Sequence, residues 1–148
     1  MFTENLATLF ERELLKLKAE IEAYKNADSL WVVSAGINNS GGNLCLHLAG
    51  NLQYFIGNVL AKTGYIRNRP EEFSLKNVPL PEMIAIIEKV IRIVPGTIRS
   101  LTPEQLAAPY PEKVFENPMT VEYFLLHLYA HLNYHLGQIN YHRRLLDI

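Results

Sequence analysis

Histidine is the residue that gives this sequence its chemistry, because four of its five histidines lie between positions 127 and 142. His127, His131 and His135 recur at every fourth residue. On an α-helix this spacing stacks side chains along one face, roughly 6 Å apart. Two imidazoles placed in this way can reach one cation at about 2.0–2.1 Å per zinc–nitrogen bond. The pattern indicates a metal site whose third ligand comes from elsewhere in the chain, where His47 is the one remaining histidine.

A helical projection separates these three histidines. With about 100° per residue and His135 at zero, His131 lies at about −40° and His127 at about −80°. His131 and His135 therefore share the apolar stripe of the helix, whereas His127 lies at its border. The stripe consists of Val121, Phe124, Leu128, Leu132, Ile139, His142 and Leu146. From this helix alone two interpretations stay open: buried histidines bonded to their neighbours, or a shared cation that satisfies one nitrogen of each.

The helix predicted over residues 41–62 has a polar face that contains His47. Asn43, Asn51 and Tyr54 project onto the same side, and apolar residues project onto the opposite side. The polar stripe is either the solvent face of an amphipathic helix or the lining of an open cavity centred on His47. It contains no carboxylate, so the sequence predicts no general base there. Its amide and hydroxyl groups are candidates to orient a substrate or to contact a metal ligand.

Glycines recur at regular spacing in this helix and just after it. Gly50, Gly57 and Gly64 are seven residues apart and predict a smooth stripe where another backbone can approach. Because glycine destabilises a helix by roughly 1 kcal/mol relative to alanine, we expect close packing or a functional demand at these positions.

The remaining periodicity predicts an all-α fold, a four-helix bundle with long loops that forms one domain over residues 1–148. Apolar residues at three/four spacing and helix-capping residues predict four helices, over residues 2–24, 41–62, 80–100 and 121–146. Pro95 predicts a bend in the third helix. Thr102 and Pro103 predict a short additional helical turn.

Two long connections carry further expectations. Residues 26–42 have a loop composition, in which Trp31, Val32 and Val33 are expected to tuck against the bundle. Residues 63–78 form a charged connection, in which Arg67 and Arg69 are expected to be solvated, the alternative being that they reach into the cleft.

Composition excludes several functional classes. The net charge of −1 and the lack of a basic cluster argue against nucleic-acid binding. No stretch approaches the roughly 20 apolar residues of a membrane span. A single cysteine, Cys45, and an N-terminus without a signal-peptide pattern favour the cytoplasm. The hydrophobic fraction of 49% favours an oligomer.

Several residues of the last helix project away from its apolar stripe. Leu126, Tyr129 and Leu136 do so, and they predict a homodimer. Tyr134 is expected to pack rather than to take part in catalysis.

The histidine segments together resemble a known family. The run His131–Ile139, followed by Arg143, Arg144 and Leu145, resembles the final-helix motif H-x3-H-x-G-Q-I of the DinB/YfiT-like superfamily. The stretch His47–Asn51 is similar to the second-helix motif of that superfamily, which carries its first metal ligand. The run Arg67–Phe73 is similar to one branch of the superfamily and suggests no role.

The resemblance implies a four-helix bundle, often dimeric, with zinc or nickel held by His47, His131 and His135. His127 matches a histidine that is usually not a ligand. Characterised members include bacillithiol S-transferases and a mycothiol-dependent maleylpyruvate isomerase, so a low-molecular-weight thiol is an expected cofactor. A cation held in this way lowers the pKa of a bound water or thiol, which suits a hydrolase or a thiol S-transferase acting on a small molecule. The alternative is a non-catalytic dimeric bundle that binds metal or a small ligand.

Overall fold

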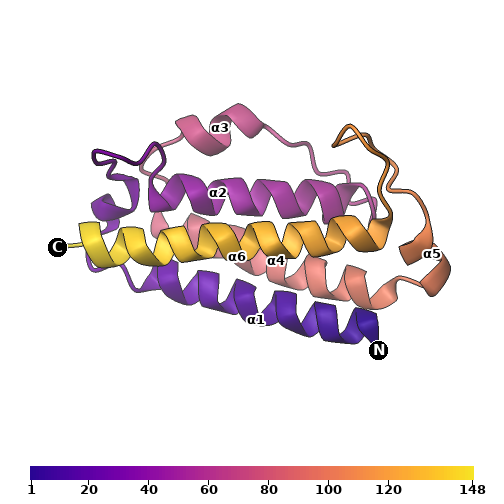
Figure 1. The fold of residues 1–148 in the computed structure, drawn as a ribbon. Coiled ribbons are helices and arrows are strands. Elements are labelled where there is room, and N and C mark those ends of the chain that lie inside the picture. Colours follow the sequence, from indigo (N-terminus) through magenta and orange to yellow (C-terminus); the bar gives the residue numbers. More distant parts are fainter.

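The computed structural model describes residues 1–148 and is all-helical, as predicted. Four long helices lie side by side, and the two chain termini lie at opposite ends of the bundle (Figure 1). The long helices are α1 (Phe2–Glu22), α2 (Gly41–Leu52), α4 (Leu80–Ser100) and α6 (Val121–Leu146). Shorter elements are η1 (Ala27–Trp31), η2 (Gln53–Asn58), α3 (Arg69–Ser74) and α5 (Pro103–Ala107). An isolated bridge pairs Pro109 with Thr120.

Local capping explains where the helices begin. The Ser40 side chain accepts a hydrogen bond from the backbone of Asn43, and the Thr120 side chain accepts one from the backbone of Tyr123. Thr102 forms a capping box with Gln105 at the start of α5. The predicted helix boundaries are confirmed for α4 and α6, whereas α1 ends at Glu22, two residues before its predicted end. The predicted second helix is instead two elements, since the α-helical part ends at Leu52 and continues as the π-helical turn η2.

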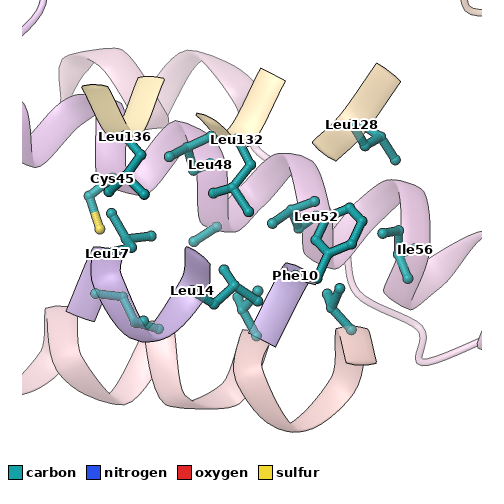
Figure 2. Close-up of a cluster of buried hydrophobic side chains, with 14 of the residues drawn as sticks. Phe10, Leu14, Leu17, Cys45, Leu48, Leu52, Ile56, Leu128, Leu132 and Leu136 are labelled. Carbon is teal, nitrogen blue, oxygen red and sulfur yellow. The ribbon is translucent and has the colours of Figure 1, made fainter. Parts of the chain in front are cut away.

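One hydrophobic core joins the long helices. Side chains of α1, α2 and α6 point toward one another within it (Figure 2). The labelled core residues are Phe10, Leu14, Leu17, Cys45, Leu48, Leu52, Ile56, Leu128, Leu132 and Leu136. Helix α4 contributes Met83, Ile87, Val90, Val94 and Ile98. Its Pro95 lies inside the helix, which runs on to Ser100 as predicted. None of the helices is both long enough and apolar enough to cross a membrane.

Several side chains differ from their predicted environments. Val32 and Val33 are 40% and 48% exposed, so only Trp31 of that group packs against the core. Leu136 is buried, whereas Tyr134 is 66% exposed. Leu136 is buried because α6 contacts both α1 and α2, so its buried arc is wider than the stripe that a helical projection suggests.

Two neighbouring leucines of α1 provide a test of the core. Leu14 is 1% exposed and Leu15 is 52% exposed. We expect Leu14→Ala to lower the free energy of unfolding by about 2–5 kcal/mol, because it removes buried methyl groups and leaves a cavity. Leu15→Ala is the matched control and should change it by less than about 0.5 kcal/mol. Urea denaturation measures both, and equal effects of the two substitutions would contradict this packing.

Candidate metal centre

Three histidines from two helices converge on one point. The Nε2 atom of His131 lies 3.1 Å from Nε2 of His47 and 3.1 Å from Nε2 of His135. The three rings meet nearly edge to face, with interplanar angles of 76°, 88° and 88°. A tetrahedral zinc ion with bonds of 2.0–2.1 Å holds its nitrogen ligands about 3.3 Å apart. The cluster therefore has the spacing of a three-histidine metal site.

Hydrogen bonds at the opposite ring nitrogens determine where the lone pairs point. Nδ1 of His47 lies 3.0 Å from a carboxylate oxygen of Glu72, and Nδ1 of His135 lies 2.7 Å from the amide oxygen of Gln138. Both oxygens only accept, so each Nδ1 carries the proton and each Nε2 presents a lone pair; these tautomers are inferred from the partners. Both lone pairs face His131.

His131 cannot satisfy both neighbours with a proton. A single N–H donates to one of the two facing lone pairs, and the second lone pair then has no donor. Its own Nδ1 is buried without a hydrogen-bond partner. A cation between the rings would accept a lone pair from all three Nε2 atoms, so the donor set of His47, His131 and His135 fits a divalent metal.

The cluster favours neutral imidazoles. Burial, reinforced by the neighbouring His135 and His47, lowers the pKa of His131 to about 3. Burial also lowers the pKa of His135, although the hydrogen bond to Gln138 opposes this shift. Metal ligation requires deprotonated imidazole, so at neutral pH these two rings are already in the form that binds a cation.

The polar face of α2 is covered by α3 and the residues that flank it, which lie above α2 in Figure 1. Asn43 is fully buried, and its amide donates to the backbone carbonyls of Glu72 and Leu75 at 3.0 and 2.8 Å. His47 and Asn51 are also buried. The interpretation of this face as a solvent face is wrong, because the charged connection folds back over it.

One charged residue of the segment that covers α2 reaches the cluster, and a second one holds it. Glu72 is 5% exposed and forms a hydrogen bond with His47. Arg67 donates hydrogen bonds to both carboxylate oxygens of Glu72, at 2.8 and 2.9 Å. Arg67 was expected to be solvated, but its side chain is only 12% exposed, because it pairs with a buried carboxylate. Burial raises the pKa of Glu72, but the hydrogen bonds from His47 and Arg67 outweigh it and hold the pKa below its usual range.

The chain matches the family model described as the DinB superfamily over residues 10–139. This range covers most of the sequence and includes all three histidines of the cluster. The chain belongs to the DinB superfamily. The resemblance stated from the histidine motifs is thereby confirmed, and so is the all-α fold that it implied. A comparison with curated proteins finds no match to this DinB-superfamily chain.

The other residues predicted for the site of this DinB-superfamily protein lie in different surroundings. Asn51 is 7% exposed, and its amide oxygen is buried without a partner one helical turn after His47. The Tyr54 hydroxyl donates to the carboxylate of Glu112, so it ties η2 to the loop before α6. His127 is exposed and lies outside the ligand cluster.

The side chain of His127 packs against aromatic rings. Its ring lies 4.9 Å from the ring of Phe115 and 5.8 Å from that of Phe124, and its centroid is 6.5 Å from that of His131.

The Asn43 amide holds α3 in place and has no free group for a substrate. Of the four residues predicted around the ligands, Asn51 is the one with a buried side-chain atom that lacks a hydrogen-bond partner.

Glu72 is the site residue that sequence reasoning missed. The partner of His47 is a carboxylate of α3, a helix that was not predicted from the sequence. Two features of the sequence could have indicated this contact. One is Gly50 in the interior of a helix without charged residues, and the other is the acidic pair that follows Pro70. A Cβ atom at Gly50 would overlap the Glu72 carboxylate, so this glycine admits a side chain rather than a backbone.

The fifth histidine has the structural role that the alternative interpretation described. His142 is buried, and its Nε2 lies 2.8 Å from the carbonyl oxygen of Val32. Its Nδ1 lies 2.8 Å from the hydroxyl of Tyr24. Both nitrogens are therefore satisfied by protein, in contrast to His131.

A cavity of about 620 Å³ opens beside His135. Its walls are the loop of residues 34–39, Leu44 and the C-terminal half of α6. No aspartate, glutamate, lysine or arginine lines it. This volume accommodates a small organic molecule.

Proposed function

We propose that this DinB-superfamily protein is a divalent-metal-dependent enzyme, a thiol S-transferase or a hydrolase, with His47, His131 and His135 as the metal ligands. We propose zinc or nickel as the metal, since both accept imidazole nitrogen ligands. The observation that carries the proposal is the convergence of three Nε2 atoms, two of which direct lone pairs at the third.

The chemistry follows from what three neutral ligands leave available. A divalent cation held by three imidazoles keeps its full charge and an open position, where it lowers the pKa of a water or thiol ligand toward neutrality. Glu72 is the one carboxylate hydrogen-bonded to a histidine of the cluster, His47, and both of its oxygens already accept hydrogen bonds. The chain therefore places no free general base beside the cluster.

The lack of a free general base beside the cluster favours a thiol over water as the nucleophile. A free thiol has a pKa of about 8.5 and water one of about 15.7, so a thiol needs far less assistance to lose its proton. A low-molecular-weight thiol attacking a small electrophile is the reaction class that these residues support best. The single buried cysteine supports a cytoplasmic location.

Metal analysis tests the ligand set. We expect the wild-type chain, purified without a nickel column, to bind one divalent ion per chain. His131→Ala should abolish this binding, because it removes the ligand between the other two. His127→Ala is the matched control on the same helix and should leave it unchanged. Elemental analysis and chelator competition measure the stoichiometry and the Kd, with circular dichroism as the check on folding. Substoichiometric metal that His131→Ala does not alter would argue decisively against the site.

The second candidate is a non-catalytic bundle that binds metal or a small ligand, and the lack of a free base favours it. A screen of thiols against electrophiles, with the zinc and nickel forms, separates the two. We expect thiol consumption that needs metal and is lost in His135→Ala. Stoichiometric metal binding without turnover for any thiol–electrophile pair would instead support the non-catalytic protein.

We also propose a homodimer, formed by an exposed apolar stripe on α6. Tyr123, Tyr134, Tyr141 and Leu145 are 59–68% exposed and project within about 40° of one another. Gly137 adjoins this stripe with open space around it, so another helix can approach closely. The stripe replaces the one predicted from the sequence, because Leu136 of that set is buried.

Light scattering tests the dimer. At micromolar concentration we expect twice the chain mass of 16.9 kDa for the wild type. Tyr134→Glu should give the chain mass itself, because it puts a charge in the centre of the stripe. Leu15→Glu, at an exposed position of α1, is the control and should leave the dimer intact. A wild-type chain that scatters as a monomer would refute the proposal.

A further inference from the structure

A buried ion pair connects the metal site to the segment that covers it. Oε1 of Glu72 lies 3.0 Å from Nδ1 of His47 and accepts a bond from Nη2 of Arg67 at 2.9 Å. Oε2 accepts from Nε of Arg67 at 2.8 Å. The side chains of Glu72 and Arg67 are 6% and 12% exposed. This pair therefore lies inside the protein and ends on a candidate metal ligand.

We propose that Glu72 is the positioning residue of the metal centre, and that it fixes His47 in the orientation in which Nε2 meets the Nε2 atoms of His131 and His135. Arg67 in turn holds Glu72. The inference rests on the metal site proposed above and adds a residue that touches neither the metal nor the substrate.

The physical reason lies in the origin of the three ligands. His131 and His135 share α6, so their spacing is set by one helix, whereas His47 comes from α2 and needs its ring oriented separately. A carboxylate at the far nitrogen of a metal-binding imidazole fixes its tautomer and ring orientation and makes it a stronger donor. Phe73 limits the ring from another side, with centroids 4.9 Å apart.

Gly50 supports this role independently of the hydrogen bonds. Glycine is a poor helix former, yet it occupies the interior of α2 one turn from His47. A Cβ atom there would overlap the Glu72 carboxylate and lie 2.7 Å from its Cδ. Helix α2 thus lacks a side chain where the carboxylate passes to reach His47.

The buried amide of Asn43 is a third observation. This amide donates hydrogen bonds to the backbone carbonyls of Glu72 and Leu75. These two bonds anchor the backbone of α3. The carboxylate is therefore held from both its backbone and its side chain. A surface ion pair would need neither this anchor nor the space at Gly50.

The first test is Glu72→Gln, which keeps the shape of the side chain and removes its charge. Chelator competition with zinc should show binding roughly 10- to 100-fold weaker than in the wild type. Glu71→Gln is the matched control, because Glu71 is the adjacent residue of α3 and is exposed. Its zinc affinity should equal that of the wild type. Circular dichroism and thermal melting establish that each variant is folded.

The second variant is Gly50→Ala, which leaves the carboxylate chemically intact and displaces it. Zinc affinity should fall as in Glu72→Gln even though alanine favours the helix. Gly96→Ala is the control, since a Cβ atom there meets nothing within 4 Å. If both substitutions act through one contact, the double variant Gly50→Ala/Glu72→Gln should lose no more affinity than either single variant.

The outcomes distinguish this inference from the proposed function. Stoichiometric zinc in the wild type, together with unchanged affinity in folded Glu72→Gln and Gly50→Ala, would overturn the role of Glu72 and leave the metal site standing. A wild-type chain that binds no zinc would overturn the metal site and this inference together. Loss of affinity in Glu71→Gln equal to that in Glu72→Gln would show a general charge effect and overturn the specific role.

Discussion

Repulsion between imidazole lone pairs is the constraint on which the site depends. Two Nε2–Nε2 separations of 3.1 Å place three nitrogens where a proton can relieve one contact and a cation can relieve both. Such crowding persists only where the surrounding structure holds the rings in place. Here the hydrophobic core fixes α2 against α6 (Figure 2), and hydrogen bonds at Nδ1 fix the rings of His47 and His135.

The part of the site that lies on α6 could be predicted from the sequence because its determinants are local. Thr120 begins the helix, and a period of 3.6 residues then decides which side chains share a face. The same rule separated His131 and His135 from His127, and the rings are arranged accordingly. The four long helices could be predicted for the same reason, since each carries its own apolar stripe and caps.

The cover over α2 could not be predicted in this way. Its residues are charged and rich in turn formers, and such segments are usually solvated, so periodicity gives no reason for burial. The contact between His47 and Glu72 joins positions 25 residues apart and depends on where the α2–α4 connection folds. The π-helical turn is likewise unmarked in the sequence, and it places Tyr54 at a change of helical phase, where the residue bonds a loop instead of the site.

The segment that covers α2 (α3 and its flanking residues) also makes one side of the histidine cluster less accessible than the other. His47 is 6% exposed beneath α3, whereas the cavity opens at His135 on the side of residues 34–39. A cation at the proposed site would therefore be reached past His135, from the side of residues 34–39. If the proposed site holds an ion, the contacts under α3 would set its affinity, and the loop of residues 34–39 would set its exchange rate. Substitutions in the loop should alter stopped-flow uptake rates while leaving the equilibrium Kd nearly constant, and a parallel change in both would contradict this division.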